Sequence, residues 1–148
     1  MFEPKKILVP TDFSGYSKKA ISEAVDLALK YKAKIVLLHV IDENILQCAA
    51  DYCLSNEFIK QFKDESMKES EDKLNKVINA VKKSKKVNIS YEVKKGVPAE
   101  VILDVAKKGI DLIVIASHGR TGIIKHLIGS VTDKIVRSAK CPVMVIRT

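Results

Sequence analysis

Short apolar runs alternate with amphipathic segments along the chain, and this alternation restricts the possible folds more than any other feature. The apolar runs have the β-branched content of buried strands and cover residues 5–10, 34–41, 88–96, 111–117 and 141–148. The segments between them place apolar residues three and four apart, as amphipathic helices do, and cover residues 17–31, 56–83, 98–108 and 130–138. Strands alternating with helices indicate an α/β, doubly wound fold, with a mostly parallel sheet and helices on both faces.

Some segments depart from the simplest form of this pattern. The run over 88–96 alternates only in part, which predicts a strand at or near a sheet edge, and residues 42–55 are expected to be irregular. The long helix over 56–83 is apolar near its ends and mostly charged over 63–73, so its middle is expected to stand clear of the core. No linker or repeat divides the 148 residues, which predicts one domain over 1–148.

The charge and composition exclude some classes of function. The chain carries 26 Lys and Arg against 18 Asp and Glu, a net charge of +8. Lysines spread over helix faces supply nearly all of the excess, and aromatic residues make up only 5% of the chain, so no nucleic-acid-binding surface is expected. No apolar run approaches the ~20 residues that span a bilayer, and the opening residues lack a secretory-signal pattern. We therefore expect no membrane segment and a cytoplasmic location.

The three cysteines do not form a recognisable metal motif. Cys48, Cys53 and Cys141 include no CxxC pair and no zinc-finger spacing with histidine. Free thiols in a reducing compartment are the favoured interpretation, and a redox pair of Cys48 and Cys53 is the less favoured one. No metal site is predicted.

The carboxyl ends of the strands are the expected place for a ligand, because an open parallel sheet binds ligands where its strand order reverses. Candidates are Pro10, Thr11 and Asp12 after the first strand, Val40 to Asp42 after the second, and Ala116 to Arg120 after the fourth. The dinucleotide motif GxGxxG and the P-loop motif GxxxxGK followed by Ser or Thr are both absent from the sequence. These two nucleotide-binding classes are therefore disfavoured.

The segment IASHGRTGIIKHLIGSVT, over 115–132, has features of a phosphate site and of a simple turn. Gly119 permits unusual backbone conformations, and Gly129 permits a ligand to approach closely. Ser130 begins a helix whose free N–H groups favour an anion, and Ser130 with Asp133 fits a capping box. Apolar residues between the glycines are expected to share one side of a helical turn and hold the loop in place; they are Ile123, Ile124, Leu127 and Ile128.

Five segments of the chain resemble the universal stress protein family (UspA-like), and within it the ATP-binding branch. They are ILVPTDFS, LLHVIDE, VKKGVPAEVI, SHGRTG and GSVTDKIVRSAKCPVMVI, and the resemblance covers nearly the whole length. That branch carries a signature of glycine, two residues, glycine, nine residues, glycine, and then serine or threonine. Gly119, Gly129 and Ser130 match its second half, and Ala116 stands in place of its first glycine.

The resemblance implies strand order 3-2-1-4-5, one ATP per subunit and a homodimer formed through the C-terminal strand. Magnesium or manganese is a candidate companion ion. In that strand order the last strand lies at a sheet edge, and a twofold dimer would cover its unpaired backbone groups.

The resemblance also assigns roles to residues of the expected site. Asp12 and the backbone near Val40 are implied to contact adenine, and the methyl group of Ala116 is expected to change the affinity more readily than to abolish the site. The other implied residues are Pro10 and Thr11 at the base and ribose, Gly119, Gly129, Ser130 and Val131 around the ribose and phosphates, and Ser117, His118 and Arg120 nearby.

Three functions remain open. The leading one is an ATP-binding regulatory or sensor protein of the stress response, with unspecified protein partners. The second is a slow ATPase or phosphotransferase using the same pocket, with Asp12, His118 and either Ser117 or Ser130 as reactive groups; no GxSxG motif activates a serine, so no catalytic residue is assigned. The third is an interaction module that binds no nucleotide, which Ala116 favours. His39 and His126 are interpreted as structural.

Overall fold

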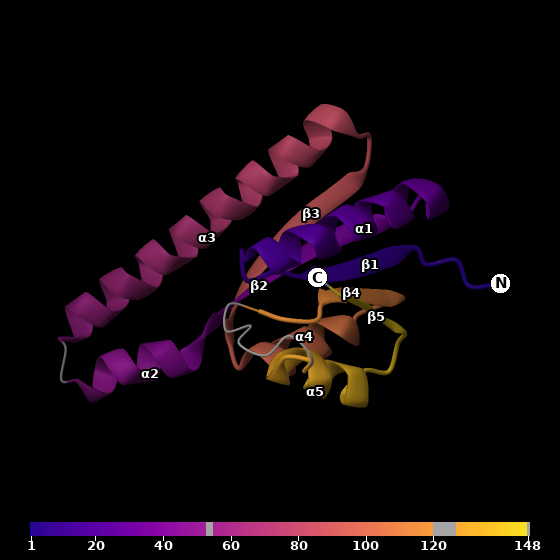
Figure 1. Cartoon of the computed structure of the whole chain (residues 1–148). Helices are drawn as coiled ribbons and strands as arrows, with labels where there is room; N and C mark the ends of the chain where they lie inside the picture. Colours follow the sequence, from indigo (N-terminus) through magenta and orange to yellow (C-terminus); the bar gives the residue numbers. More distant parts are fainter. Residues whose placement is uncertain (53–54, 120–126, 148) are drawn as a thin grey trace.

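Five parallel strands form one sheet in the order β3-β2-β1-β4-β5 (Figure 1). This computed structural model describes residues 1–52, 55–119 and 127–147. The predicted α/β fold and strand order are confirmed, and β3 lies at a sheet edge as expected. In chain order the elements are β1 (Lys6–Pro10), α1 (Gly15–Tyr31), β2 (Lys34–Asp42), α2 (Glu43–Asp51), α3 (Asn56–Ser84), β3 (Asn88–Gly96), α4 (Pro98–Ala106), β4 (Leu112–Ala116), α5 (Ser130–Ser138) and β5 (Val143–Ile146).

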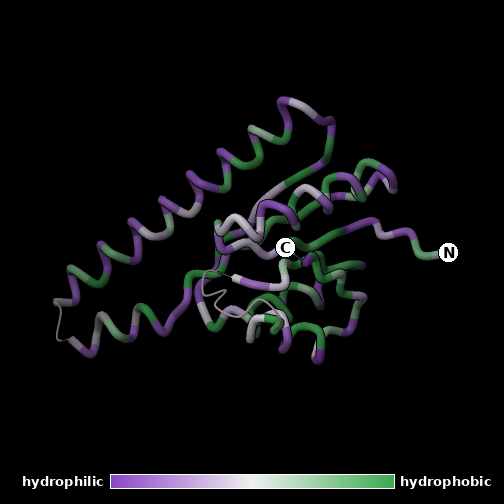
Figure 2. Tube along the Cα trace, in the orientation of Figure 1, coloured by the Kyte–Doolittle hydropathy of each residue, from purple (hydrophilic) through white to green (hydrophobic). Residues whose placement is uncertain are grey.

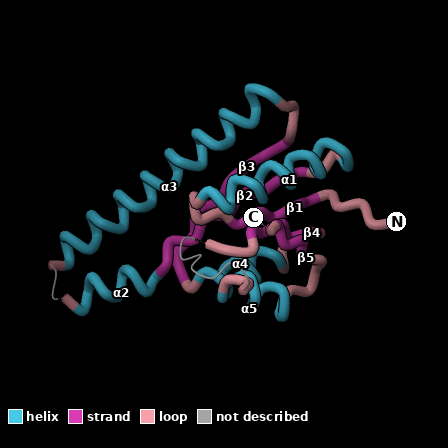
Figure 3. The backbone as a smooth tube through the Cα atoms, in the orientation of Figure 1, coloured by secondary structure: helices cyan, strands magenta, loops and turns pink. Residues whose placement is uncertain are grey.

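Helices cover both faces of the sheet (Figure 3). On one face, strand residues such as Ile7 share an apolar cluster with α1 and with Leu74 of α3. On the other face, strand residues such as Leu8 share a second cluster with α4 and with Ile135 of α5. Successive residues of a strand point to opposite faces, so strands covered on both faces need the continuous apolar runs seen in the sequence.

Two helix ends agree with their sequence signals. α4 begins at Pro98, where the missing N–H costs little, as expected for a proline in the first turn. It ends at Ala106, and Gly109 follows with a φ of 73°, a left-handed conformation that favours glycine. Within the described residues, no helix combines the length and the apolar character needed to cross a membrane.

The α2 helix corrects the expectation that residues 42–55 are irregular. Nine residues, Glu43–Asp51, are helical, and the Asn44 amide donates to Asp42 Oδ1 at 2.9 Å where the helix begins. Ile45 on this helix is 57% exposed. The exposure of Ile45 is consistent with the absence of a core-facing apolar pattern at this position of the sequence.

The prediction that the middle of the long helix stands clear of the core is wrong in part. Ser70 and Leu74 are 6% and 0% exposed, so the end of the charged segment 63–73 packs on the body of the protein. It is the N-terminal part that stands clear, where Phe58 is 50% exposed beside α2. A helix of 29 residues is about 44 Å long, whereas a strand of nine residues such as β3 spans about 30 Å, so the helix outruns the sheet. The N-terminal part of α3 and the α2 helix form a projecting pair, and Figure 2 shows both as a mixture of hydrophilic and apolar residues.

Candidate functional site

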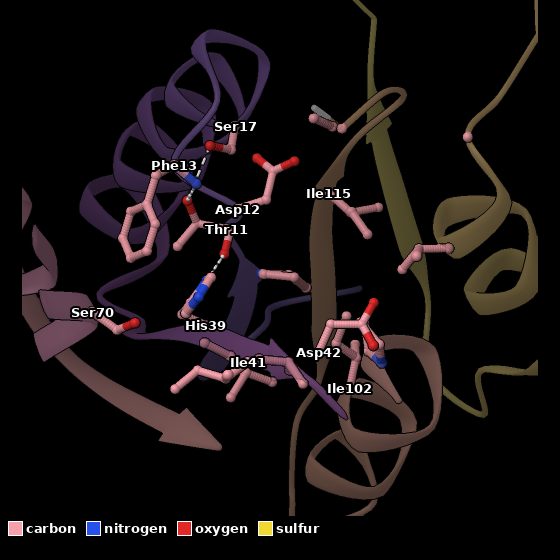
Figure 4. A pocket seen from close by; sticks show the side chains of 18 of the residues that line it. Thr11, Asp12, Phe13, Ser17, His39, Ile41, Asp42, Ser70, Ile102 and Ile115 are labelled. Carbon is pink, nitrogen blue, oxygen red and sulfur yellow. Dashed lines mark hydrogen bonds between the residues drawn. The ribbon is translucent and has the colours of Figure 1, made fainter. Parts of the chain in front are cut away.

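A cavity of about 530 Å³ lies at the carboxyl ends of β1, β2 and β4 (Figure 4). β2 and β4 flank β1 on opposite sides, so this is where the strand order reverses. The first turn of α5 and one face of α3 supply further walls. Small-molecule pockets usually measure roughly 300–1,000 Å³, so the cavity has the size of a ligand site.

The loop after β1 is held by hydrogen bonds of the buried residue Thr11. Its amide donates to the Leu38 carbonyl oxygen at 2.9 Å, which continues the pairing of β1 with β2. Its hydroxyl donates to Ser17 Oγ at 3.0 Å and accepts from the Phe13 amide at 3.1 Å. Because Ser17 lies in the first turn of α1, these bonds fix the loop between β1 and α1 that carries Asp12.

The Asp12 carboxylate lies where the loops after β1 and β4 meet. Its Oδ1 accepts from the Ser14 amide at 2.9 Å. A Cβ atom added to Gly119 would lie 2.7 Å from Asp12 Oδ2, closer than real Cβ atoms come. A side chain at position 119 would therefore require the Asp12 carboxylate to move. The expected unusual backbone conformation at Gly119 is wrong, because only Gly96 and Gly109 among the described glycines have a positive φ.

The start of α5 corrects the predicted capping box. Gly129 is the N-cap residue and Ser130 is the first residue inside the helix, so Ser130 does not occupy the capping position. The Asp133 amide donates to the Gly129 carbonyl oxygen at 2.9 Å, and the Asp133 carboxylate instead pairs with Arg137 at 2.9 Å. The Gly129 amide donates to the Ser117 carbonyl oxygen at 2.8 Å, which fixes the helix start against the loop after β4.

The first turn of α5 borders the cavity. Ser130, Val131 and Thr132 line it, and N–H groups in the first turn of a helix have no acceptor within that helix. Together with the helix dipole they favour a negatively charged group. The Thr132 hydroxyl donates to the Ala116 carbonyl oxygen at 2.8 Å, so the helix start is tied to the end of β4. The position of the helix start beside the cavity is thus fixed by hydrogen bonds within the protein.

Ala116, Ser117 and His118 lead from β4 into the loop and differ in their access to the cavity. Ala116 borders it but is only 5% exposed, and it belongs to the apolar cluster on the α1 side. Ser117 is 3% exposed and is not among the described residues that line the cavity. His118 does line it, and its Nδ1 forms a hydrogen bond of 2.9 Å with Ser117 Oγ.

Phe13 and His39 form an aromatic pair beside the cavity that sequence reasoning did not assign to the site. Their ring centroids are 4.4 Å apart. His39 Nδ1 donates to the Thr11 carbonyl oxygen at 2.8 Å, because a carbonyl oxygen only accepts. Burial and this bond agree with a structural role for His39, but the residue also lines the cavity. Phe13 has a φ of 65°, which is uncommon for a residue with a Cβ atom.

One face of α3 forms the wall that the sequence analysis missed. Its residues at the cavity are Phe62, Ser66, Glu69, Ser70 and Lys73. They recur three and four positions apart, which is the spacing of one helix face. The signal was present in the sequence as small or aromatic residues at helical spacing within an otherwise charged segment.

The structure brings most of the predicted site residues together. Leu127 and Ile128 are 60% and 43% exposed, so these two residues do not hold the loop against the body as expected. Arg120, Ile123, Ile124 and His126 lie outside the described residues. The predicted residues that line the cavity are Pro10, Thr11, Asp12, Val40, Ala116, His118, Gly119, Gly129, Ser130 and Val131.

The described cysteines are free thiols. Cys48 is exposed and Cys141 is partly buried, and Cys53 lies outside the described residues. Burial raises the pKa of the Cys141 thiol above its ordinary value. In the described part of the chain, no group of three or more His, Cys, Asp or Glu side chains is placed to hold a metal ion.

Comparison with known proteins identifies close relatives. Residues 3–147 match the universal stress protein family. YxiE of Bacillus subtilis is 34% identical over 148 residues, which cover 96% of this chain and 98% of the relative. MJ0577 of Methanocaldococcus jannaschii is 32% identical over 155 residues, covering 97% and 94% of the two chains. The solved structure of MJ0577 matches with a TM-score of 0.85 at 28% identity, over 100% of this chain and 98% of that one. UspA from Lactobacillus plantarum matches with a TM-score of 0.81 at 29% identity, over 97% of each chain.

Proposed function

The chain belongs to the universal stress protein family, and on that premise we propose that it binds an adenine nucleotide, ATP in particular, in the cavity. The bound nucleotide then regulates the conformation or the partners of the protein in a cytoplasmic stress response. One observation carries this proposal: a single cavity offers a carboxylate, apolar walls and a helix N-terminus. These features suit the amino group, the purine ring and the phosphates of a nucleotide.

Asp12 and the end of β2 are proposed to hold the base. A carboxylate only accepts hydrogen bonds, and the exocyclic amino group of adenine donates them. Val40, Ile102 and Ile115 line the same cavity and offer an apolar surface for the purine (Figure 4 labels Ile102 and Ile115). A carboxylate also accepts from the N1–H and the 2-amino group of guanine, so the preference for adenine rests on the family resemblance and not on Asp12 alone.

The start of α5 is proposed to hold the phosphates, through the backbone N–H groups of Ser130 and Val131. A magnesium or manganese ion that accompanies the nucleotide would neutralise part of the phosphate charge. The described side chains offer no ready set of protein ligands for such an ion, so its binding would depend mainly on the phosphates.

Two further structures of this fold support an adenine nucleotide as the ligand class. A universal stress protein in complex with cAMP matches with a TM-score of 0.67 at 20% identity. The Archaeoglobus fulgidus universal stress protein in complex with dAMP also matches with a TM-score of 0.67, at 16% identity.

The decisive experiment is to denature the purified protein and search for released adenine nucleotide by mass spectrometry. We expect released nucleotide, or, for nucleotide-free protein, a thermal shift when ATP is added. Asp12→Ala should reduce both signals, whereas Lys76→Met on the exposed side of α3 should leave them unchanged. Absence of released nucleotide together with absence of a shift would reject the proposal and favour the interaction module that binds no nucleotide.

A second candidate function is nucleotide hydrolysis, and the hydrogen bond between Ser117 and His118 is the observation that favours it. Against it, the Ser117 side chain is almost fully buried beneath the site. Phosphate release that depends on Asp12 and on magnesium or manganese would support an enzyme. Binding of ATP without turnover in the presence of either ion would exclude it.

The β5 edge of the sheet is the proposed surface for a homodimer. β5 pairs only with β4 in the described sheet, and Met144 on it is 38% exposed. A second copy placed across a twofold axis would cover this apolar edge. Sedimentation should show a dimer at micromolar concentration, and a monomer there would contradict the assignment.

A further inference from the structure

The geometry points to Lys73 of α3 as a positioning residue that acts on Asp12 through the ring of Phe13. This inference rests on the proposed function, since Asp12 is the carboxylate proposed to hold the base. It extends that function to α3, a helix to which the sequence analysis assigns no part in the site. Its consequence is that the packing of α3 and the occupancy of the cavity affect each other.

The Phe13 ring packs against the apolar cluster on the α1 side and also contacts groups from β2 and α3. The ring of His39, on β2, lies 4.4 Å from it between centroids, and the ammonium of Lys73, on α3, lies 5.3 Å from its centroid. An ammonium at this distance from a ring is attracted to it electrostatically. His39 is in turn fixed by its bond to the Thr11 carbonyl oxygen. Figure 4 shows the Phe13 ring beside His39, with the Asp12 side chain directed to the other side of the loop.

The backbone of Phe13 has an unfavourable conformation, which the contacts of its ring help to maintain. Its φ of 65° costs conformational energy for a residue with a Cβ atom, and such a conformation persists only where the surroundings hold it. The Phe13 amide donates to Thr11 Oγ1, and the next amide, of Ser14, donates to Asp12 Oδ1. If the ring loses a contact, residue 13 can relax, and the bond from the Ser14 amide that orients the Asp12 carboxylate weakens.

Lys73 is well placed to act on the ring. It lies on the part of α3 that packs on the body, next to the buried Leu74. Its ammonium also pairs with Glu69 Oε1 at 2.6 Å, one turn earlier on the helix, which limits the orientations that the side chain adopts. The lysine is about half exposed, so its effect on the loop is expected to be moderate.

The first test needs no ligand and measures hydrogen exchange of the Ser14 amide by NMR. Lys73→Met removes the ammonium and keeps the length of the side chain, and the Ser14 amide should then exchange about two- to five-fold faster. Lys73→Arg restores a cation over the ring and should restore the protection. Lys76→Met, which removes an exposed lysine from the same helix, is the matched control and should change nothing. Unchanged Ser14 exchange in Lys73→Met would overturn the inference.

The second test measures ATP affinity by calorimetry in a double-mutant cycle with Phe13→Ala. Lys73→Met should weaken ATP binding about two- to five-fold in the wild-type background and add nothing once the Phe13 ring is gone. If Lys73→Met costs the same in both backgrounds, the lysine contacts the nucleotide directly and does not act through Phe13.

The two tests separate this inference from the proposed function. Faster Ser14 exchange in a protein that binds no adenine nucleotide would reject the proposed function and keep the positioning of the loop by Lys73. Normal ATP binding by Lys73→Met, with unchanged Ser14 exchange, would keep the proposed function and reject the positioning role.

Discussion

The loops at the carboxyl ends of the strands and the projecting pair of α2 and α3 border the same cavity, yet they are held very differently. Thr11 and Gly129 make short hydrogen bonds to other strands or loops, and Gly119 lies against Asp12 without room for a Cβ atom. In the projecting pair, by contrast, the side chains of Ile45 and Phe58 are 57% and 50% exposed. The loop side of the cavity is therefore fixed by hydrogen bonds, whereas the projecting ends of α2 and α3 have few packing constraints. We therefore expect the loop side to select the proposed ligand, and the projecting ends of α2 and α3 to open more readily than the loops.

The largest expected effect compares the two ends of α3. Leu74→Ala removes a fully buried side chain from the core cluster and should lower the free energy of unfolding by about 2–5 kcal/mol. Phe58→Ala, on the projecting part, should cost about 1 kcal/mol or less. Urea unfolding of both variants checks this. Equal costs would show that the N-terminal part of α3 is packed as firmly as the rest.

The next effect tests the tight contact between the loops. Gly119→Ala would place a Cβ atom 2.7 Å from Asp12 Oδ2, so the carboxylate must turn away from this position, at a cost of about 0.5–1.5 kcal/mol and with weaker ATP binding. Gly15→Ala is the matched control, since nothing lies within 4 Å of the added atom there. Thermal unfolding and calorimetry measure the two effects. Full stability and affinity in Gly119→Ala would contradict a close fit at this point.

A smaller effect is expected at Ala116, the departure from the ATP-binding signature. Because its side chain belongs to the apolar cluster, Ala116→Gly should lower the free energy of unfolding by about 1 kcal/mol. ATP affinity should change by no more than about two-fold, a difference of less than about 0.5 kcal/mol. A large gain in affinity would show instead that the methyl group crowds the nucleotide.

The last prediction compares the alkylation rates of the Cys48 and Cys141 thiols, measured in a Cys53→Ser background. Cys48 on α2 is exposed, whereas Cys141 is partly buried and burial raises the pKa of its thiol. Less thiolate is therefore present at Cys141 at neutral pH, and iodoacetamide should modify it several-fold more slowly than Cys48. Its rate should keep rising with pH above the ordinary cysteine pKa. Equal rates at pH 7 would show that the Cys48 and Cys141 thiols are equally accessible.

Much of the site follows from local sequence patterns. Pro10, Thr11 and Asp12 end a buried apolar run, and Ala116 ends another, so a parallel sheet places them together. Gly129 likewise precedes a short helix that sequence periodicity indicates. The positions of these strand ends depend only on the direction of the strands, and the order of strands and helices in the sequence is enough to predict that direction.

Other parts were mispredicted because they depend on contacts between distant residues. The value of Gly119 lies in its distance to Asp12, not in its own backbone angles. The capping box fails because the N-cap of α5 is Gly129 and not Ser130, and the Gly129 amide bonds to Ser117, 12 residues earlier in the chain. To predict that α3 lines the cavity, one would need to know how far the long helix extends past the edge of the sheet.

The sequence by itself determined the alternation of strands and helices, the parallel sheet and the strand ends that carry Asp12 and Gly129. These follow from hydrophobic periodicity and right-handed connections, which act within and between neighbouring elements. Only the tertiary structure decided that α3 lines the cavity and that the Phe13 ring contacts both His39 and Lys73. Such contacts join residues from separate elements, and their formation depends on the crossing of a helix over the sheet, which no local pattern in the sequence encodes.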